Sequence, residues 1–81
     1  MKGETGYTVH GMRIRTRRQR KGWRQEDLAK ATGLQTGTIS RIETGYHPNT
    51  QLRTIGAIAG VLGCSVDDLL TWNIPLDWEA S

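Results

Sequence analysis

Side chains that could hydrogen-bond a nucleic-acid base are concentrated in residues 25–45, QEDLAKATGLQTGTISRIETG. Arg41 carries a guanidinium, which can bond the O6 and N7 atoms of a guanine together. Ile39 and Ile42 are three residues apart, so in a helix they share one side and leave Arg41 and its polar neighbours on the other side. The pattern therefore predicts a helix whose apolar edge is buried and whose polar face is free to contact a ligand.

Two short helices joined by a tight turn are predicted to position these side chains. The first covers 25–32 and the second covers 36–44, followed by a glycine. Ala29 is small enough for the two helices to approach closely, and Gly33 can adopt the positive φ that such a turn requires. The spacing is typical of a helix-turn-helix unit.

Three further helices are predicted, over about 12–21, about 51–62, and from 66 to 70 or 71. Ser65 is a good N-cap for the last of them. The fold class expected is all-α, a compact five-helix domain with a short extended C-terminal tail. The predicted core consists of Ile14, Leu28, Ala29, Leu34, Ile39, Ile42, Leu52, Ile55, Ile58, Leu62, Val66 and Leu69. Gly56 and Gly60 lie on one face of helix 51–62, where either another helix approaches closely or the face meets solvent.

The composition restricts the classes of function. Eighty-one residues suit one domain with one small core, and the single cysteine, Cys64, excludes an internal disulfide. We find no membrane-spanning run, no signal-peptide pattern, no Cys/His metal site and no catalytic arrangement of nucleophile, base or paired carboxylates. We expect a cytoplasmic protein that is not an enzyme and has no metal, no cofactor and no small-molecule ligand.

The net charge of +3 is distributed unevenly. Residues 1–24 carry +7, residues 25–50 carry −1 and residues 51–81 carry −3. A basic front and an acidic rear favour an oriented approach to a polyanion. The alternative is a solvated charged helix followed by an acidic tail.

The two ends of the chain differ from the predicted helical domain, residues 12–71. Residues 1–11 are rich in glycine and threonine and are predicted to form a flexible arm. In residues 72–81, apolar and polar residues alternate, which is typical of an extended segment with one apolar edge. That edge holds Trp72, Ile74, Leu76 and Trp78. It either folds back on its own domain or forms a dimer interface, and we prefer the dimer.

Residues 12–71 resemble the lambda-repressor-like, Cro/Xre-type helix-turn-helix family. The resemblance rests on IRTRRQRKGWRQEDLAKATGL, TISRIETG and TIGAIAGVLGCSVDDLL, which cover about three quarters of the chain. Apolar spacing, turn glycines, Gln25, Arg18 and Glu43 match the family together. The family binds double-stranded DNA, so the resemblance implies the same partner here.

The resemblance also implies roles for individual residues. Helix 36–44 resembles the recognition helix, with base readout by Thr36, Gly37, Ser40 and Arg41. Candidate phosphate contacts are Arg24, Gln25, Gln35, Thr38, Tyr46, His47 and Asn49. Arg18 and Glu43 resemble a structural ion pair between the first helix and the end of the third. For Arg41 the alternative is a phosphate contact or a solvated charge.

Three residues depart from the family pattern. Arg17 replaces a leucine that usually lies in the first helix, and its stem can cover the edge of the core. Arg24 replaces a capping Ser or Thr, which costs about 1 kcal/mol, but it places a cation beside Gln25. Gly37 removes a side chain from the recognition helix, so DNA shape would contribute part of the sequence preference.

The function expected is that of a sequence-specific DNA-binding transcriptional regulator. It would be a homodimeric repressor or autoregulator that reads a palindromic operator through helix 36–44. A phage-type repressor, a restriction–modification controller and an antitoxin-like autoregulator all remain open. The alternative is a protein-interaction adaptor or antitoxin-like module that binds a protein partner through the C-terminal tail.

Overall fold

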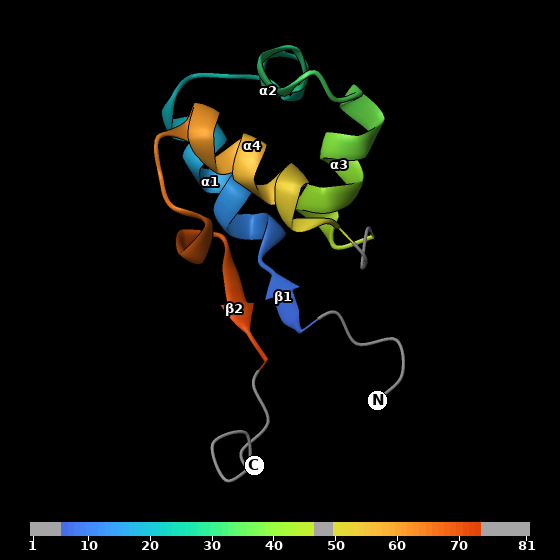
Figure 1. Ribbon diagram of the computed structural model, residues 1–81. Helices are drawn as coiled ribbons and strands as arrows, with labels where there is room; N and C mark the ends of the chain where they lie inside the picture. The colour runs from blue at the N-terminus through green and yellow to red at the C-terminus, as the bar shows by residue number, and fades with distance from the viewer. Residues whose placement is uncertain (1–5, 47–49, 74–81) are drawn as a thin grey trace, which may run out of the picture.

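The computed structural model describes residues 6–46 and 50–73 of the chain. Its elements in chain order are β1 (Tyr7–Val9), α1 (Gly11–Arg20), α2 (Gln25–Thr32), α3 (Thr36–Thr44), α4 (Leu52–Leu62), a 3-10 turn η1 (Val66–Asp68) and β2 (Leu70–Trp72) (Figure 1). The predicted second and third helices have the observed bounds. The first begins at Gly11 and ends at Arg20, and the fourth begins at Leu52, each one residue from the prediction.

The turn between α2 and α3 depends on Gly33. This residue has φ 77° and ψ 12°, a left-handed conformation in which a side chain would be strained. The amide of the next residue, Leu34, donates to the Ala29 carbonyl at 3.0 Å. A carbonyl in the last turn of α2 therefore keeps a hydrogen-bond partner where the helix ends. The helix-turn-helix geometry therefore follows from the glycine predicted to provide it.

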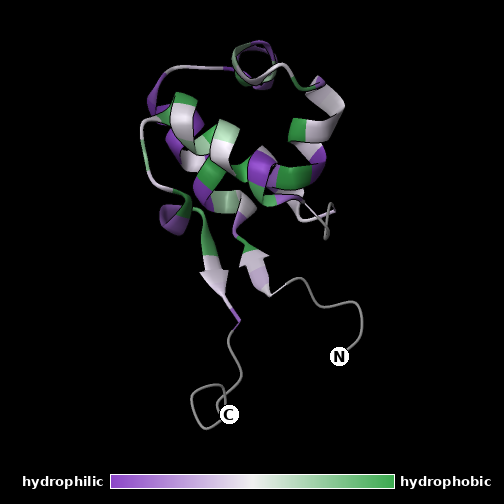
Figure 2. Cartoon of the chain, in the orientation of Figure 1, coloured by the Kyte–Doolittle hydropathy of each residue, from purple (hydrophilic) through white to green (hydrophobic). Residues whose placement is uncertain are grey.

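In residues 6–46 and 50–73, one apolar core lies between α1, α2, α3 and α4. Hydrophobic and hydrophilic segments alternate along α3 and α4, as Figure 2 shows, and the hydrophobic positions face inward. The buried apolar residues are Ile14, Leu28, Ala29, Ile39, Ile42, Ile55, Ile58, Ala59, Leu62, Leu69 and Leu70. Leu34 and Val66 are only partly buried. Leu52 was wrongly assigned to the core: as the first residue of α4 it is 40% exposed.

The expectation of an all-α fold is wrong in one respect, because β1 and β2 form a two-stranded antiparallel sheet. Tyr7 pairs with Trp72 and Val9 with Leu70. Tyr7, Thr8 and Val9 are residue types that favour strands, and the buried Leu70 fixes β2 against the core. The predicted arm, residues 1–11, therefore contains a strand, and Gly11 is already helical.

The expectation of a fifth α-helix is also wrong. Val66–Asp68 make a single 3-10 turn. Ser65 caps it as predicted, since its hydroxyl accepts from the Asp68 amide at 3.2 Å and the Asp68 carboxylate accepts from the Ser65 amide at 3.0 Å. The turn stops because β2 begins at Leu70, whose side chain enters the core.

The extended tail begins earlier than its apolar pattern indicated. Trp72 ends β2 and meets the Tyr7 ring edge-on, with ring centroids 5.7 Å apart. Ile74, Leu76 and Trp78 lie outside the described residues. Within the described part of the chain, none of the helices is long and apolar enough to cross a membrane.

At Gly11 the start of α1 lies very close to the backbone of α3. A Cβ atom built on it would lie 2.3 Å from the Ile42 carbonyl oxygen and 2.5 Å from that of Glu43. The start of α1 therefore packs directly on the backbone at the end of α3. Only a glycine fits there without a backbone shift.

Candidate nucleic-acid interface

A buried ion pair fixes the far end of α3 to α1. Arg18 Nε donates to Glu43 Oε2 at 2.6 Å, and Arg18 Nη2 donates to Glu43 Oε1 at 3.0 Å. Arg18 Nη1 also donates to the Trp23 carbonyl at 2.8 Å. Both charged residues are only 7% exposed, so Arg18 is a structural residue and is not available to DNA. This is the pairing that the family resemblance implied.

Gln25 joins the same network from the start of α2. Its Nε2 atom donates to Glu43 Oε1 at 3.1 Å, and the residue is half-buried. The network therefore holds the N-terminus of α2 at a set distance from α3. A helix N-terminus carries a partial positive charge and is suited to a phosphate, but part of the Gln25 side chain is already engaged within the protein.

Arg24 lies exposed directly before α2. Its side chain has no acceptor with which to cap the helix, so only the reciprocal half of a capping box forms: the Asp27 carboxylate accepts from the Arg24 amide at 2.8 Å. The Arg24 guanidinium is 3.9 Å from Asp27 and 4.0 Å from Glu26. Its charge is thus exposed to solvent but shared with two carboxylates.

The polar residues of α3 lie on one outer face of the helix, opposite Ile39 and Ile42. Thr36, Gly37 and Arg41 are exposed, Ser40 and Thr38 are half-buried, and Gln35 is exposed at the N-cap. No atom lies within 4 Å of a Cβ built on Gly37, so packing does not require a glycine there. The missing side chain leaves open space on this face.

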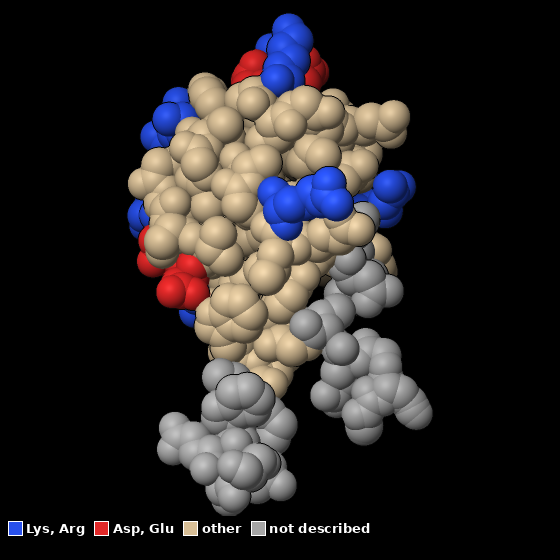
Figure 3. All heavy atoms as spheres, in the orientation of Figure 1, with Lys and Arg blue, Asp and Glu red and all other residues tan. Residues whose placement is uncertain are grey.

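The segment that follows α3 contributes an exposed aromatic residue, since Tyr46 is 78% exposed. His47 and Asn49, the two other predicted contacts of this segment, lie outside the described residues. The predicted set omits Arg53, which is exposed in the first turn of α4. Figure 3 shows basic side chains beside α3 and at the near end of α4. The signal for Arg53 was its place just after the loop that follows α3.

Three exposed arginines lie on or next to the helices of this region. Arg41 is exposed on α3, and its guanidinium can bond two acceptors at once. Arg53 is exposed in the first turn of α4, and the exposed Arg24 directly precedes α2. Among the described residues, no group of three or more His, Cys, Asp or Glu side chains is arranged to hold a metal ion.

Comparison with known proteins gives matches over the same region. A helix-turn-helix family model matches residues 14–69. The chain is 35% identical over 48 residues to the SPbeta prophage-derived HTH-type transcriptional regulator YotL of Bacillus subtilis (strain 168), a match that covers 59% of this chain and 60% of that protein.

Solved structures of similar fold include two regulators. The restriction–modification controller protein C.AhdI from Aeromonas hydrophila has a TM-score of 0.68 and 33% identity, with 72% of this chain and 86% of that chain covered. The biofilm master regulator SinR, a Bacillus subtilis protein, was solved in complex with DNA. Its TM-score is 0.67 and its identity 30%, and the match covers 70% of this chain and 90% of that chain. SinR was also solved in complex with SinI, and the match to that structure covers 54% of the chain in the complex.

The family match spans the buried network, the turn at Gly33 and the outer face of α3. It also agrees with the resemblance that the sequence motifs indicated. The chain belongs to the lambda-repressor-like, Cro/Xre-type helix-turn-helix family.

Proposed function

We propose that this chain is a sequence-specific, double-stranded DNA-binding transcriptional regulator that reads base edges through α3. The observation that carries the proposal is the outer face of α3, where exposed Arg41, Thr36 and Gly37 lie beside half-buried Ser40. The buried network between Arg18 and Glu43 supports it, because a fixed helix loses little conformational freedom on entering the major groove.

Phosphate contacts would position α3 in the groove without reading sequence. Arg24 and Gln25 at the start of α2, Tyr46 after the C-terminal end of α3 and Arg53 in the first turn of α4 are suited to phosphates. Gln35 and Thr38 would contact the backbone close to the helix start, and His47 and Asn49 belong to the same predicted set. The positive charge of residues 1–24 favours association with DNA in general.

We further propose that the regulator is a homodimeric repressor that binds a palindromic operator. A two-fold dimer presents two copies of α3 to two half-sites and doubles the number of phosphate contacts. The similarity to C.AhdI, a restriction–modification controller, and to a prophage-derived regulator supports a small autoregulator of one of these kinds.

Replacing Arg41 by alanine is expected to weaken binding to the preferred operator by about 1–3 kcal/mol and to relax preference at one base pair of each half-site. The physical reason is the loss of a bidentate contact to a base. The measurement is a titration of an operator selected from a random DNA pool, together with single-base variants of that operator, at fixed near-physiological salt.

Arg41→Lys is the matched control, since it keeps the charge and loses the planar fork. If Arg41 contacts only a phosphate, the Arg41→Lys variant should bind DNA as tightly as the unaltered chain, and neither variant should change the base preference. That result would contradict base readout by Arg41. Gln25→Ala serves as a second comparison, because loss of a phosphate contact should weaken all DNA sequences alike.

A protein-interaction adaptor is the second candidate, favoured by the SinR–SinI complex and by the exposed Trp72 of this chain. Salt separates the two functions. The affinity for DNA should fall steeply as the salt concentration rises, because the release of counterions from DNA then becomes less favourable. The affinity for a protein bound through apolar contacts should change little with salt.

A further inference from the structure

The side chain of Tyr7 links β1 to the connection between α3 and α4. Its hydroxyl donates a hydrogen bond to the Thr50 carbonyl at 2.5 Å, although the two residues are 43 positions apart in the sequence. Thr50 is completely buried, and α4 begins two residues later at Leu52. Strand β1 therefore reaches the end of the domain where α3 finishes and α4 starts (Figure 1).

The same stretch of chain also contacts the other end of this connection. The backbone of Gly11 lies so close to α3 that a Cβ atom would be 2.3 Å from the Ile42 carbonyl oxygen and 2.5 Å from that of Glu43. Residues 7–11 thus contact the chain on both sides of the segment that joins α3 to α4, at the last turn of α3 and at the Thr50 carbonyl. Because both contacts reach backbone atoms, they restrict the spacing between the end of α3 and the start of α4.

The sheet that carries Tyr7 is fixed to the body of the domain. Tyr7 pairs with Trp72, and their rings meet edge-on with centroids 5.7 Å apart. One residue before β2, the Leu69 carbonyl accepts from the His10 amide at 2.9 Å, and the Leu69 side chain is buried in the core. The Tyr7 hydroxyl therefore projects from a support that has little freedom to move.

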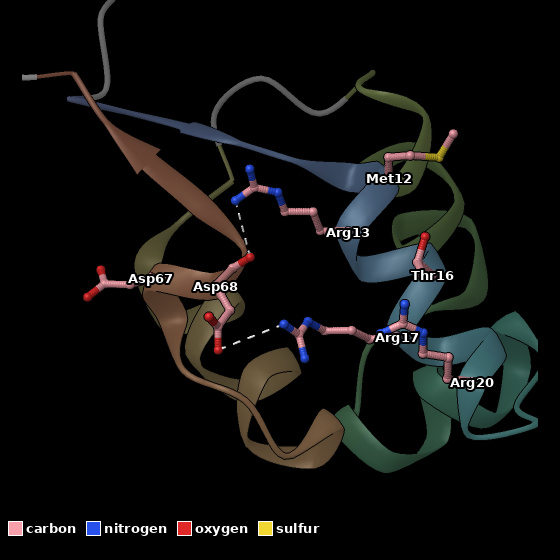
Figure 4. Close-up of a pocket in the computed structure, with 7 residues that line it drawn as sticks. All are labelled: Met12, Arg13, Thr16, Arg17, Arg20, Asp67 and Asp68. Carbon is pink, nitrogen blue, oxygen red and sulfur yellow. Dashed lines mark hydrogen bonds and ion pairs between the residues drawn. The ribbon is translucent and has the colours of Figure 1, made fainter.

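Side chains of α1 add to this support. Arg13 Nη1 donates to the Asp68 carbonyl at 3.5 Å, and Arg17 Nη2 lies 4.0 Å from Asp68 Oδ2. Figure 4 shows both arginines extending from α1 across a pocket toward Asp68. These contacts are long and partly exposed, so each contributes little, but both restrict the turn that leads into β2.

The part of the proposed DNA surface that depends on the Tyr7 contact is the start of α4. Arg53 is exposed in its first turn and is suited to a phosphate. The amides of Thr54 and Ile55 donate to the Gln51 carbonyl at 3.0 and 3.1 Å, so the first turn is built directly on the residue that follows Thr50. A hydrogen bond to the Thr50 carbonyl therefore restricts the direction in which this turn presents the Arg53 side chain.

We propose that Tyr7 is a positioning residue for DNA binding, which acts through the Thr50 carbonyl to hold Arg53 where it can bond a phosphate. Tyr7 itself does not contact the DNA. A phosphate contact positions a regulator on the duplex and carries no sequence information, so Tyr7 contributes to affinity and not to base preference. The inference rests on the proposed DNA-binding function and assigns part of it to the sheet, which that proposal does not use.

Removing the Tyr7 hydroxyl tests this role. Tyr7→Phe keeps the ring that meets Trp72 and removes the hydroxyl that bonds Thr50. The variant is expected to bind the selected operator about fivefold more weakly, which is the scale of one hydrogen bond, with unchanged preference among single-base variants of that operator. The slope of log affinity against log salt concentration should become shallower by about one at most, because one phosphate contact is weakened. Titrations at several salt concentrations give both quantities.

A double-mutant cycle with Arg53→Ala separates positioning from general stability. If Tyr7 acts through Arg53, Tyr7→Phe should weaken binding in the unaltered chain and have no further effect once Arg53 is replaced by alanine. A residue that only stabilises the fold would lower the midpoint of urea unfolding without this dependence on Arg53. Thr71→Val is the matched control: it removes a hydroxyl of the same sheet, which bonds His10 Nε2 at 2.6 Å, and should leave DNA binding unchanged.

Two results would overturn the inference: operator affinity and salt dependence of Tyr7→Phe equal to those of the unaltered chain, or effects of Tyr7→Phe and Arg53→Ala that add. Both leave the proposed function standing as long as the unaltered chain binds the operator and Arg41→Ala weakens that binding. An unaltered chain that binds no DNA would instead overturn both proposals.

Discussion

Alanine at residue 11 is expected to lower the free energy of unfolding by about 3 kcal/mol. The added methyl carbon would lie 2.3 Å from the Ile42 carbonyl oxygen and 2.7 Å from the Glu43 carbonyl carbon. Both atoms belong to the backbone of α3, so relief requires the two helices to separate and leaves their contact less well packed. Urea unfolding of Gly11→Ala, followed by circular dichroism at 222 nm, measures the loss.

Gly60→Ala is the matched control for this substitution. Gly60 lies inside α4, is exposed, and has no atom within 4 Å of a built Cβ. Alanine there should stabilise the fold by up to about 1 kcal/mol through helix propensity. Equal stability of Gly11→Ala and the unaltered chain would show that α1 and α3 are not in the contact described above.

Removing the Glu43 carboxylate is expected to destabilise the fold strongly. Glu43→Ala leaves the buried Arg18 guanidinium without its partner and should cost about 3–5 kcal/mol of unfolding free energy. It also removes the acceptor for Gln25, so α2 and α3 should lose their common anchor. Equilibrium urea unfolding gives the first effect, and amide hydrogen exchange of α3 gives the second.

Two comparisons separate this effect from general charge loss. Arg18→Met combined with Glu43→Leu removes both charges and should recover much of the stability, because an apolar pair of similar volume avoids the desolvation cost. Asp27→Asn removes the charge from an exposed pair with Arg24 and keeps an amide oxygen that can accept from the Arg24 backbone N–H, so it should cost about 1 kcal/mol or less. A cost for Glu43→Ala no larger than that of Asp27→Asn would refute the role given to the buried pair.

The parts of the fold governed by local rules were predictable from the sequence. The 3.6-residue period set the bounds of α2 and α3 correctly and those of α1 and α4 to within about one residue, and Gly33 occupies its turn as expected. Helix bounds and the turn at Gly33 depend on residues that are neighbours along the chain, so the local sequence pattern is sufficient to predict them.

The parts that depend on distant partners were not predictable. Tyr7 pairs with Trp72 across 65 residues, and three-residue strands are too short to produce a periodic pattern of their own. The need for glycine at residue 11 also arises from the approach of α3, not from any local turn. Leu52 satisfied the helical period but lies at the start of α4, where the helix has not yet reached the core.

The outer face of α3 was predictable only in part. Ile39 and Ile42 correctly indicated which side of the helix is buried. The engagement of Gln25 by Glu43 was not foreseen, because it depends on the distance between two helices and not on either sequence alone. Which bases the exposed side chains contact stays a prediction for the operator titration.

The pairing of β1 with β2 also determines how the domain would respond to mechanical force. Tension applied between residues 6 and 73 would act at one end of an antiparallel pair, where Tyr7 meets Trp72. The ladder would then break one hydrogen bond at a time, as in unzipping, instead of sharing the load along both strands. The sheet would yield before helices α1 to α4, and the helix-turn-helix unit would remain folded while the chain on either side of it lengthens.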